Sequence, residues 1–160
     1  MASIKLATLN INGLTSPTRV AMLEAFLRLQ EIDILFLQEV TQHILGDLHG
    51  YTTHYNIGTT TRVTTIVTKD EIQLANISNI PSRRAIAAKF REVWIINIYA
   101  PYGTARKQER EQIYNSELAY LLRDAPENII LGGDFNCILE KRLYGHLQLQ
   151  PSASRTGKRR

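Results

Sequence analysis

A short, mainly apolar run, Ile32–Leu37, is the feature that most limits how this chain can fold. It directly follows an amphipathic segment that begins with Ser16 and Pro17, suited to an N-cap and a first helical position, and extends toward Glu31. A short, mainly apolar strand after a helix is typical of a central strand covered on both faces. The sequence therefore predicts an α/β protein in which helices flank the sheets.

Further strand-like segments, separated by turn residues, continue this pattern along the chain. Those in the middle resemble a meander of antiparallel strands, preceded by a short helical stretch near Thr41–Leu48. A long polar helix is expected from about Thr104 to Pro126. The other expected strands are Ile4–Asn10, Tyr51–Asn56, Arg62–Lys69, Ile72–Ile77, Arg84–Phe90, Val93–Tyr99 and Asn128–Leu131. The alternative, a doubly wound nucleotide-binding fold, is disfavoured because no glycine-rich dinucleotide fingerprint or P-loop follows the first strand.

Composition limits the class of protein without giving a function. The chain has 160 residues, 44% hydrophobic and 21% charged, which is enough apolar material for one domain. Cys137 is the only cysteine, which excludes an internal disulfide and a zinc site built on thiolates. No apolar stretch is long enough to cross a bilayer. We therefore expect a soluble, intracellular protein without a membrane partner, with a nuclear location left open.

The net charge of +4 is unevenly distributed. Six basic residues and one acidic residue lie between positions 135 and 160, so the positive charge belongs to the end of the chain. The last ten residues are rich in serine and basic residues and are expected to be disordered. These patterns predict a folded domain over residues 1–139 and a basic tail over residues 140–160.

Polar residues mark the ends of four expected strands. Because strand ends converge in packed sheets, side chains that are distant in sequence can meet there. The four clusters are Asn10 with Asn12, Gln38 with Glu39, Asn97 with Tyr99, and Asp134 with Asn136.

Each cluster also has a plainer interpretation when taken alone. Glu39 could be a solvated acid at a strand end, and the pair Asp134 and Asn136 could form an Asx-turn. Turn formation would likewise explain asparagines before Gly13. A buried amide that bonds to a neighbour would explain Asn97, and core packing would explain Tyr99.

In their joint order, these clusters resemble a known family. The segments Thr8–Leu14, Leu37–Glu39, Ile96–Pro101 and Leu131–Asn136 read TLNINGL, LQE, INIYAP and LGGDFN. They closely resemble the endonuclease domain of non-LTR (LINE-type) retrotransposons. This domain is a branch of the endonuclease/exonuclease/phosphatase superfamily and is related to apurinic endonucleases and deoxyribonuclease I. The resemblance spans residues 4–139 and corresponds to the amino-terminal portion of that domain.

The resemblance implies a two-layer β-sandwich flanked by helices, of the deoxyribonuclease I type, with an incomplete second half. It implies that Glu39 holds Mg²⁺ or Mn²⁺ and that Asn10 helps to order the ligand shell. Asp134 would align or deprotonate the attacking water, and Asn136 would donate to the phosphate or the nucleophile. Tyr99 would hydrogen-bond near the scissile phosphate. The implied reaction is metal-assisted hydrolysis of a DNA phosphodiester.

The family's later motifs, a second aspartate and a Ser-Asp-His sequence, are absent. Asp134 is the last aspartate of the 160 residues, and His146 is the only later histidine and is not expected to substitute. We therefore expect a fragment that lacks turnover by itself and exposes sheet edges and an apolar face through which it could associate. The other three histidines, His43, His49 and His54, are expected to have surface or structural roles.

Two other functions stay open at this point. One is a weak enzyme whose missing histidine is supplied by another chain or dispensed with. The other is a non-enzymatic nucleic-acid- or protein-binding module that uses the basic tail and the exposed sheet.

Overall fold

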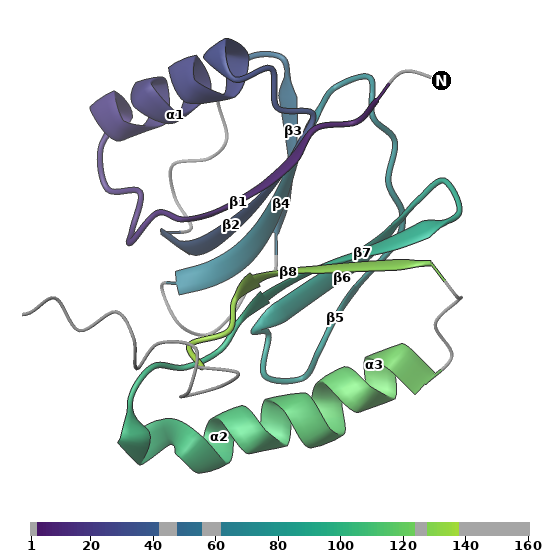
Figure 1. The fold of residues 1–160 in the computed structure, drawn as a ribbon. Coiled ribbons are helices and arrows are strands. Elements are labelled where there is room, and N and C mark those ends of the chain that lie inside the picture. The colour runs from purple at the N-terminus through teal and green to yellow at the C-terminus, as the bar shows by residue number, and fades with distance from the viewer. Residues whose placement is uncertain (1–2, 42–47, 56–61, 124–127, 138–160) are drawn as a thin grey trace, which may run out of the picture.

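The computed structural model describes residues 3–41, 48–55, 62–123 and 128–137, which form two four-stranded β-sheets packed face to face (Figure 1). Helix α1 (Pro17–Leu29) lies on the outer face of one sheet, and a longer helical connection lies on the outer face of the other. The order of layers is helix, sheet, sheet, helix. This confirms the α/β sandwich expected from the sequence.

The first sheet has the strand order β1-β2-β4-β3. Strands β1 and β2 are parallel because α1 carries the chain back between them, whereas β4 is antiparallel to both of its neighbours. Helix α1 begins as the sequence predicts, since the Ser16 hydroxyl accepts a hydrogen bond from the Arg19 N–H at 3.4 Å and Pro17 occupies the first turn. The strands are β1 (Leu6–Asn10), β2 (Ile34–Thr41), β3 (Tyr51–Tyr55) and β4 (Arg62–Lys69).

The second sheet has its strands in chain order, β5-β6-β7-β8, with β7 and β8 parallel. The strands are β5 (Ala75–Asn79), β6 (Ala85–Phe90), β7 (Val93–Tyr99) and β8 (Ile129–Asp134). The helical connection from β7 toward β8 consists of η2 (Thr104–Arg106), α2 (Lys107–Gln112), the π-helical turn η3 (Ile113–Leu118) and α3 (Ala119–Arg123).

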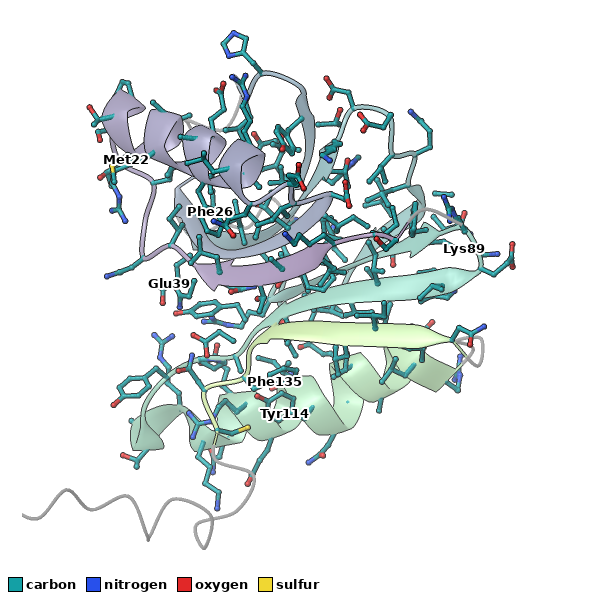
Figure 2. The ribbon with its side chains drawn as sticks, turned by 45° about the horizontal axis from the view of Figure 1, so that its top comes forward. Met22, Phe26, Glu39, Lys89, Tyr114 and Phe135 are labelled. Atoms are coloured by element: carbon teal, nitrogen blue, oxygen red, sulfur yellow. The ribbon has the colours of Figure 1, made fainter. Side chains whose placement is uncertain are left out.

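Each sheet therefore contains one parallel pair joined by helical structure. Asn10 lies beside Gln38 in the first pair, and Tyr99 lies beside Asp134 in the second. The carboxyl ends of parallel strands are the usual place for ligand sites in α/β proteins. Figure 2 shows Glu39 at this end of the sandwich and Lys89 at the opposite end.

Buried side chains form three layers, and β2 contributes to two of them. Leu35 and Leu37 pack toward α1, whereas Ile34 and Phe36 pack between the sheets. Burial of a large aliphatic or aromatic side chain contributes about 1.5–3 kcal/mol, so these layers dominate the stability of the fold. The third layer joins the second sheet to the helical connection and includes Ile80, Ala85, Ala87, Ile96, Ile98, Ile113 and Leu118.

Two expectations about the elements need correction. The expected strand Ile72–Ile77 is displaced, because the Ile72 N–H closes the turn after β4 by donating to the Lys69 carbonyl, and the strand is Ala75–Asn79. This strand also does not belong to the expected meander, since it pairs with β6 in the second sheet. The doubly wound alternative, which the sequence disfavoured, is excluded because two separate mixed sheets form. Smaller differences are that α1 ends at Leu29 and that β2 continues past Leu37.

Several expectations fall on residues outside the described ranges. They concern the helical stretch near Thr41–Leu48, most of which is not described, the helix end at Pro126 and the basic tail over 140–160. His43 and His146 lie there as well.

Strand β8 forms one edge of the second sheet, and its apolar side chains are partly open to solvent. Ile129, Ile130 and Leu131 are 38%, 44% and 38% exposed, respectively. An exposed apolar edge was expected from the sequence, and β8 has this character. None of the helices in the described ranges has the length and apolarity that a bilayer crossing requires.

Candidate active site

Four strands deliver polar side chains to one end of the sandwich. The Asn10 side-chain amide, at the end of β1, donates to Glu39 Oε1 at 3.3 Å and to Asp134 Oδ2 at 2.8 Å. The Tyr99 hydroxyl, at the end of β7, donates to the same Glu39 oxygen at 2.7 Å. Asn10, Glu39, Tyr99 and Asp134 therefore form one hydrogen-bonded cluster, although 124 positions separate the first from the last.

Glu39 reaches this cluster through an irregularity in β2. The register between β2 and β4 shifts between Leu37 and Val40, and Glu39 has a φ of +57°. A bulge re-aims the side chain that it carries, and a left-handed backbone is costly for a residue such as glutamate. The bulge is anchored by Gly13, whose N–H donates to the Glu39 carbonyl at 2.7 Å. The sequence had indicated that Glu39 follows the strand. In the structure Glu39 lies within the strand.

Asp134 depends on a close approach between β7 and β8. A Cβ placed on Gly133, which has a φ of +131°, would lie 2.0 Å from the Ile98 carbonyl oxygen. Only glycine allows the two backbones to come this near. Asp134 then accepts the Asn136 backbone N–H at Oδ1, at 3.0 Å, while its carbonyl accepts the Ala100 N–H at 2.8 Å.

Asn136 and Asn12, two other residues from the predicted clusters, lie beside these four residues and bond to other partners. The side-chain amide of Asn136 donates to the Ala100 carbonyl at 2.7 Å, which ties the loop after β8 to the end of β7. A primary amide carries two N–H donors, so this bond uses one of them. Asn12 bends back, with its N–H donating to Asn10 Oδ1 at 3.0 Å. The Asx-type turns considered from the sequence are therefore present beside the cluster.

The donor set suits a hard divalent cation. Glu39 and Asp134 offer carboxylate oxygens at a partly exposed strand end, where the Asn10 side-chain N–H groups hold them together. Within the residues that the structure describes, no group of three or more His, Cys, Asp or Glu side chains could hold a metal ion. An ion held here would keep several water ligands, as Mg²⁺ does when one or two carboxylates bind it. The residues therefore fit Mg²⁺ and do not fit a zinc site, which needs more protein ligands.

The sequence did not indicate the role of Arg84. Its guanidinium carbon lies 5.5 Å from the centre of the Tyr99 ring, and its Nε donates to Glu109 Oε1 of α2 at 2.9 Å. A cation over an aromatic face is attractive. Counting outward from the Arg91–Glu92 turn along the β6–β7 hairpin places Arg84 opposite Tyr99, so this neighbour could have been found from the sequence.

Tyr114 supports the loop that contains Asp134. Its hydroxyl donates to the Phe135 carbonyl in a short hydrogen bond, and its ring is stacked with that of Phe135 at 6.4 Å between centroids. Figure 2 shows both residues between β8 and α2. Burial, reinforced by Cys137, raises the pKa of Tyr114 well above its ordinary value. The sequence placed position 114 within the expected polar helix and gave no sign of this contact.

Comparison with known proteins identifies the family to which this geometry belongs. The endonuclease/exonuclease/phosphatase family matches residues 7–157. The chain belongs to this family. The superfamily predicted from the four motifs is therefore confirmed.

A curated relative is a transposon protein, the Transposon TX1 uncharacterized 149 kDa protein of Xenopus laevis. It is 26% identical over 155 residues, which cover 88% of this chain and 12% of the relative. This similarity agrees with the retrotransposon branch that the motifs indicated.

Solved structures share the fold. An AP endonuclease from Archaeoglobus fulgidus has a TM-score of 0.69 at 19% identity, covering 87% of this chain and 60% of that chain. The 3′ phosphatase NExo from Neisseria, bound to a product DNA hairpin, has a TM-score of 0.69 at 22% identity with the same coverage of both chains. This chain thus spans 60% of each of these structures.

Proposed function

We propose that the cluster of Asn10, Glu39, Tyr99 and Asp134 is the metal-binding half of a Mg²⁺-dependent DNA phosphodiesterase site. The observation that carries the proposal is the Asn10 amide that bonds to both carboxylates, because it draws two negative charges from different sheets to one point. Such a pair is stabilised when a cation neutralises it. DNA as the substrate is supported by the family and by its DNA-processing relatives.

Each residue has a role that its contacts support. Glu39, with Asn10 ordering the surrounding shell, would hold Mg²⁺, which when bound would polarise the phosphate and stabilise the charge that develops on it. Asp134 would orient or deprotonate the attacking water, and its side chain is already fixed by Asn10 and by the Asn136 N–H. Tyr99 and Asn136 would donate hydrogen bonds to phosphate oxygens.

We further propose that this chain by itself binds metal and DNA without turning over. A general acid to protonate the leaving oxygen is needed opposite the attacking water. The two described histidines do not supply it, since His49 bonds to Glu24 and His54 bonds to Thr68. Loss of such a group typically slows catalysis by orders of magnitude.

A combined binding and nicking experiment tests this function. With Mg²⁺ and supercoiled plasmid, the expected result is DNA binding that requires the metal and no nicked circles. In Asp134→Asn, DNA binding should weaken, whereas the same change at Asp33, at the opposite end of β2, should leave it unchanged. Mg²⁺-dependent nicking that disappears in Asp134→Asn would contradict the proposal that the chain is inactive. DNA binding that is the same with and without Mg²⁺ would contradict the proposed metal site.

The non-enzymatic alternative has less support. It depends largely on the basic segment 140–160, which lies outside the described residues. A binding module of that kind would respond to salt concentration and not to Mg²⁺ specifically or to changes at Asp134.

A further inference from the structure

The core directly beneath the candidate site is polar, although the rest of the space between the sheets is filled mainly by aliphatic side chains. Gln38 on β2 and Asn97 on β7 are only 1% and 0% exposed, and they bond to each other through Gln38 Nε2 and Asn97 Oδ1 at 2.6 Å. Burying an amide is costly unless all of its bonds are made. This buried amide pair therefore has to be explained by what it bonds to.

Asn97 bonds to the backbone at the point where the β2–β4 ladder breaks. Its Nδ2 donates to the Leu37 carbonyl and to the Thr65 carbonyl, both at 2.8 Å. Leu37 and Thr65 are the last residues paired before the register shifts, and the ladder resumes at Val40. A side chain from the opposite sheet thus supplies donors to both carbonyls at the start of the bulge.

Gln38 extends the same network to β1. Its Nε2 lies 3.1 Å from Thr8 Oγ1 and 3.2 Å from the Phe36 carbonyl. The amide pair consequently joins β1, β2, β4 and β7. Residues two apart on a strand share a face, so Thr8 lies beneath Asn10 and Asn97 lies beneath Tyr99.

We propose that Gln38 and Asn97 are positioning residues, which fix where the bulge forms in β2 and thereby aim the Glu39 carboxylate into the site. The inference rests on the proposed function for the role of Glu39 as a metal ligand. It adds that the ligand is held by a network outside the metal shell. An apolar pair of similar volume could fill the same space, so packing alone does not require amides here. What the amides add is a fixed location for the break in the ladder.

The Gly13 amide reports on this bulge without any metal, because it donates to the Glu39 carbonyl at 2.7 Å. In Asn97→Leu, which keeps the branched side-chain shape and removes the donors, we expect Gly13 amide exchange to be at least about 10-fold faster and Mn²⁺ affinity to fall about 10- to 100-fold. The measurements are ¹H–¹⁵N hydrogen exchange of the metal-free protein and Mn²⁺ titration followed by water proton relaxation, both in conditions where each variant is folded.

A matched control separates positioning from general destabilisation. Ile95 lies on β7 in the apolar layer between the same two sheets, so Ile95→Ala removes buried apolar contacts without removing a hydrogen-bond donor. It should lower stability and leave both the Gly13 amide and Mn²⁺ affinity as in wild type. If Asn97→Leu does not fold, Gln38→Met, which removes the bonds to Thr8 and Asn97, is measured in the same way.

The proposal is overturned if the Gly13 amide of the asparagine or glutamine variant behaves as in wild type, or if Ile95→Ala changes it equally. Failure of the proposed function looks different. In that case wild type would bind no Mn²⁺, while the Gly13 amide would still decide whether the amide pair positions the bulge.

Discussion

The two ends of β2 hold an acidic side chain in different ways. Just before the strand, Asp33 accepts the Lys5 backbone N–H at 2.8 Å and the Lys69 ammonium at 2.6 Å. The Lys5 N–H first, and then Lys69, hold the pKa of Asp33 below its ordinary value. Near the other end, Glu39 accepts the Asn10 amide and the Tyr99 hydroxyl, which are neutral donors.

This contrast separates a structural acid from a candidate functional one. The charge of Asp33 is balanced by a cation that the chain itself provides, and its bonds tie β2 to β4 and to the segment before β1. Glu39 shares the Asn10 amide with a second acid, Asp134. We propose the meeting of these two acids as the cation site, whereas the pairing of Asp33 with Lys69 ties β2 to β4 and contributes to stability.

The largest expected loss of stability concerns the backbone that delivers Asp134. Gly133→Ala should lower the free energy of unfolding by about 4 kcal/mol or more, because the new Cβ would lie 2.0 Å from the Ile98 carbonyl oxygen. Urea denaturation measures this. Gly103→Ala is the control, since its φ is +96° but no atom lies within 4 Å of the added Cβ, and it should cost about 1–2 kcal/mol. Equal losses of unfolding free energy in the two variants would mean that the close approach of β8 to β7 does not stabilise this end of the sandwich.

A smaller loss is expected at the opposite end of β2. Asp33→Asn should cost about 1–2 kcal/mol at pH 7, because a charge-assisted hydrogen bond is lost, and it should not alter metal binding. The pKa of Asp33 is lowered in the folded state, so its contribution is present above its unfolded pKa and disappears as the pH falls through the folded value. Urea unfolding of both proteins between pH 7 and pH 2 tests this. A difference that persists at the acid limit would contradict the ionic role.

Local sequence patterns were enough to predict the parts of the fold that depend on neighbouring residues. Ser16 and Pro17 predict the start of α1, and the strand expected after the Arg91–Glu92 turn, Val93–Tyr99, has the bounds of β7. The meeting of Asn10, Glu39, Tyr99 and Asp134 was predicted through the order of the motifs and the family that they resemble.

Other features depend on residues far apart in the chain and could not be read locally. The bulge at Glu39 involves Asn97, whose donor reaches a carbonyl 60 positions away. The assignment of β5 to the second sheet is likewise decided by pairing with β6 and not by its own sequence. Local patterns specify that a strand forms, and tertiary contacts decide its sheet and its irregularities.

Strand β4 carries a buried hydroxyl on the face that it shares with Val67, the face turned toward α1. Among the described residues, Thr65 Oγ1 is the buried side-chain polar atom without a hydrogen-bond partner. Thr65→Val keeps the side-chain shape and removes this desolvated hydroxyl, so the free energy of unfolding should rise by up to about 1 kcal/mol. Thermal unfolding measures it. A loss of stability would show that the hydroxyl makes a stabilising contact.

The smallest expected effect on stability belongs to Glu39 itself, and it tests the central claim most directly. Glu39→Gln should change the free energy of unfolding by no more than about 0.5 kcal/mol, yet lower Mn²⁺ affinity by at least about 100-fold. The same substitution at Glu92, an exposed acid that pairs with Lys89 at the other end of the sandwich, should change neither quantity appreciably. A Mn²⁺ titration of the three proteins decides the matter. Affinity lost only in Glu39→Gln is the result predicted, and equal affinity in all three would contradict a metal site at the end of β2.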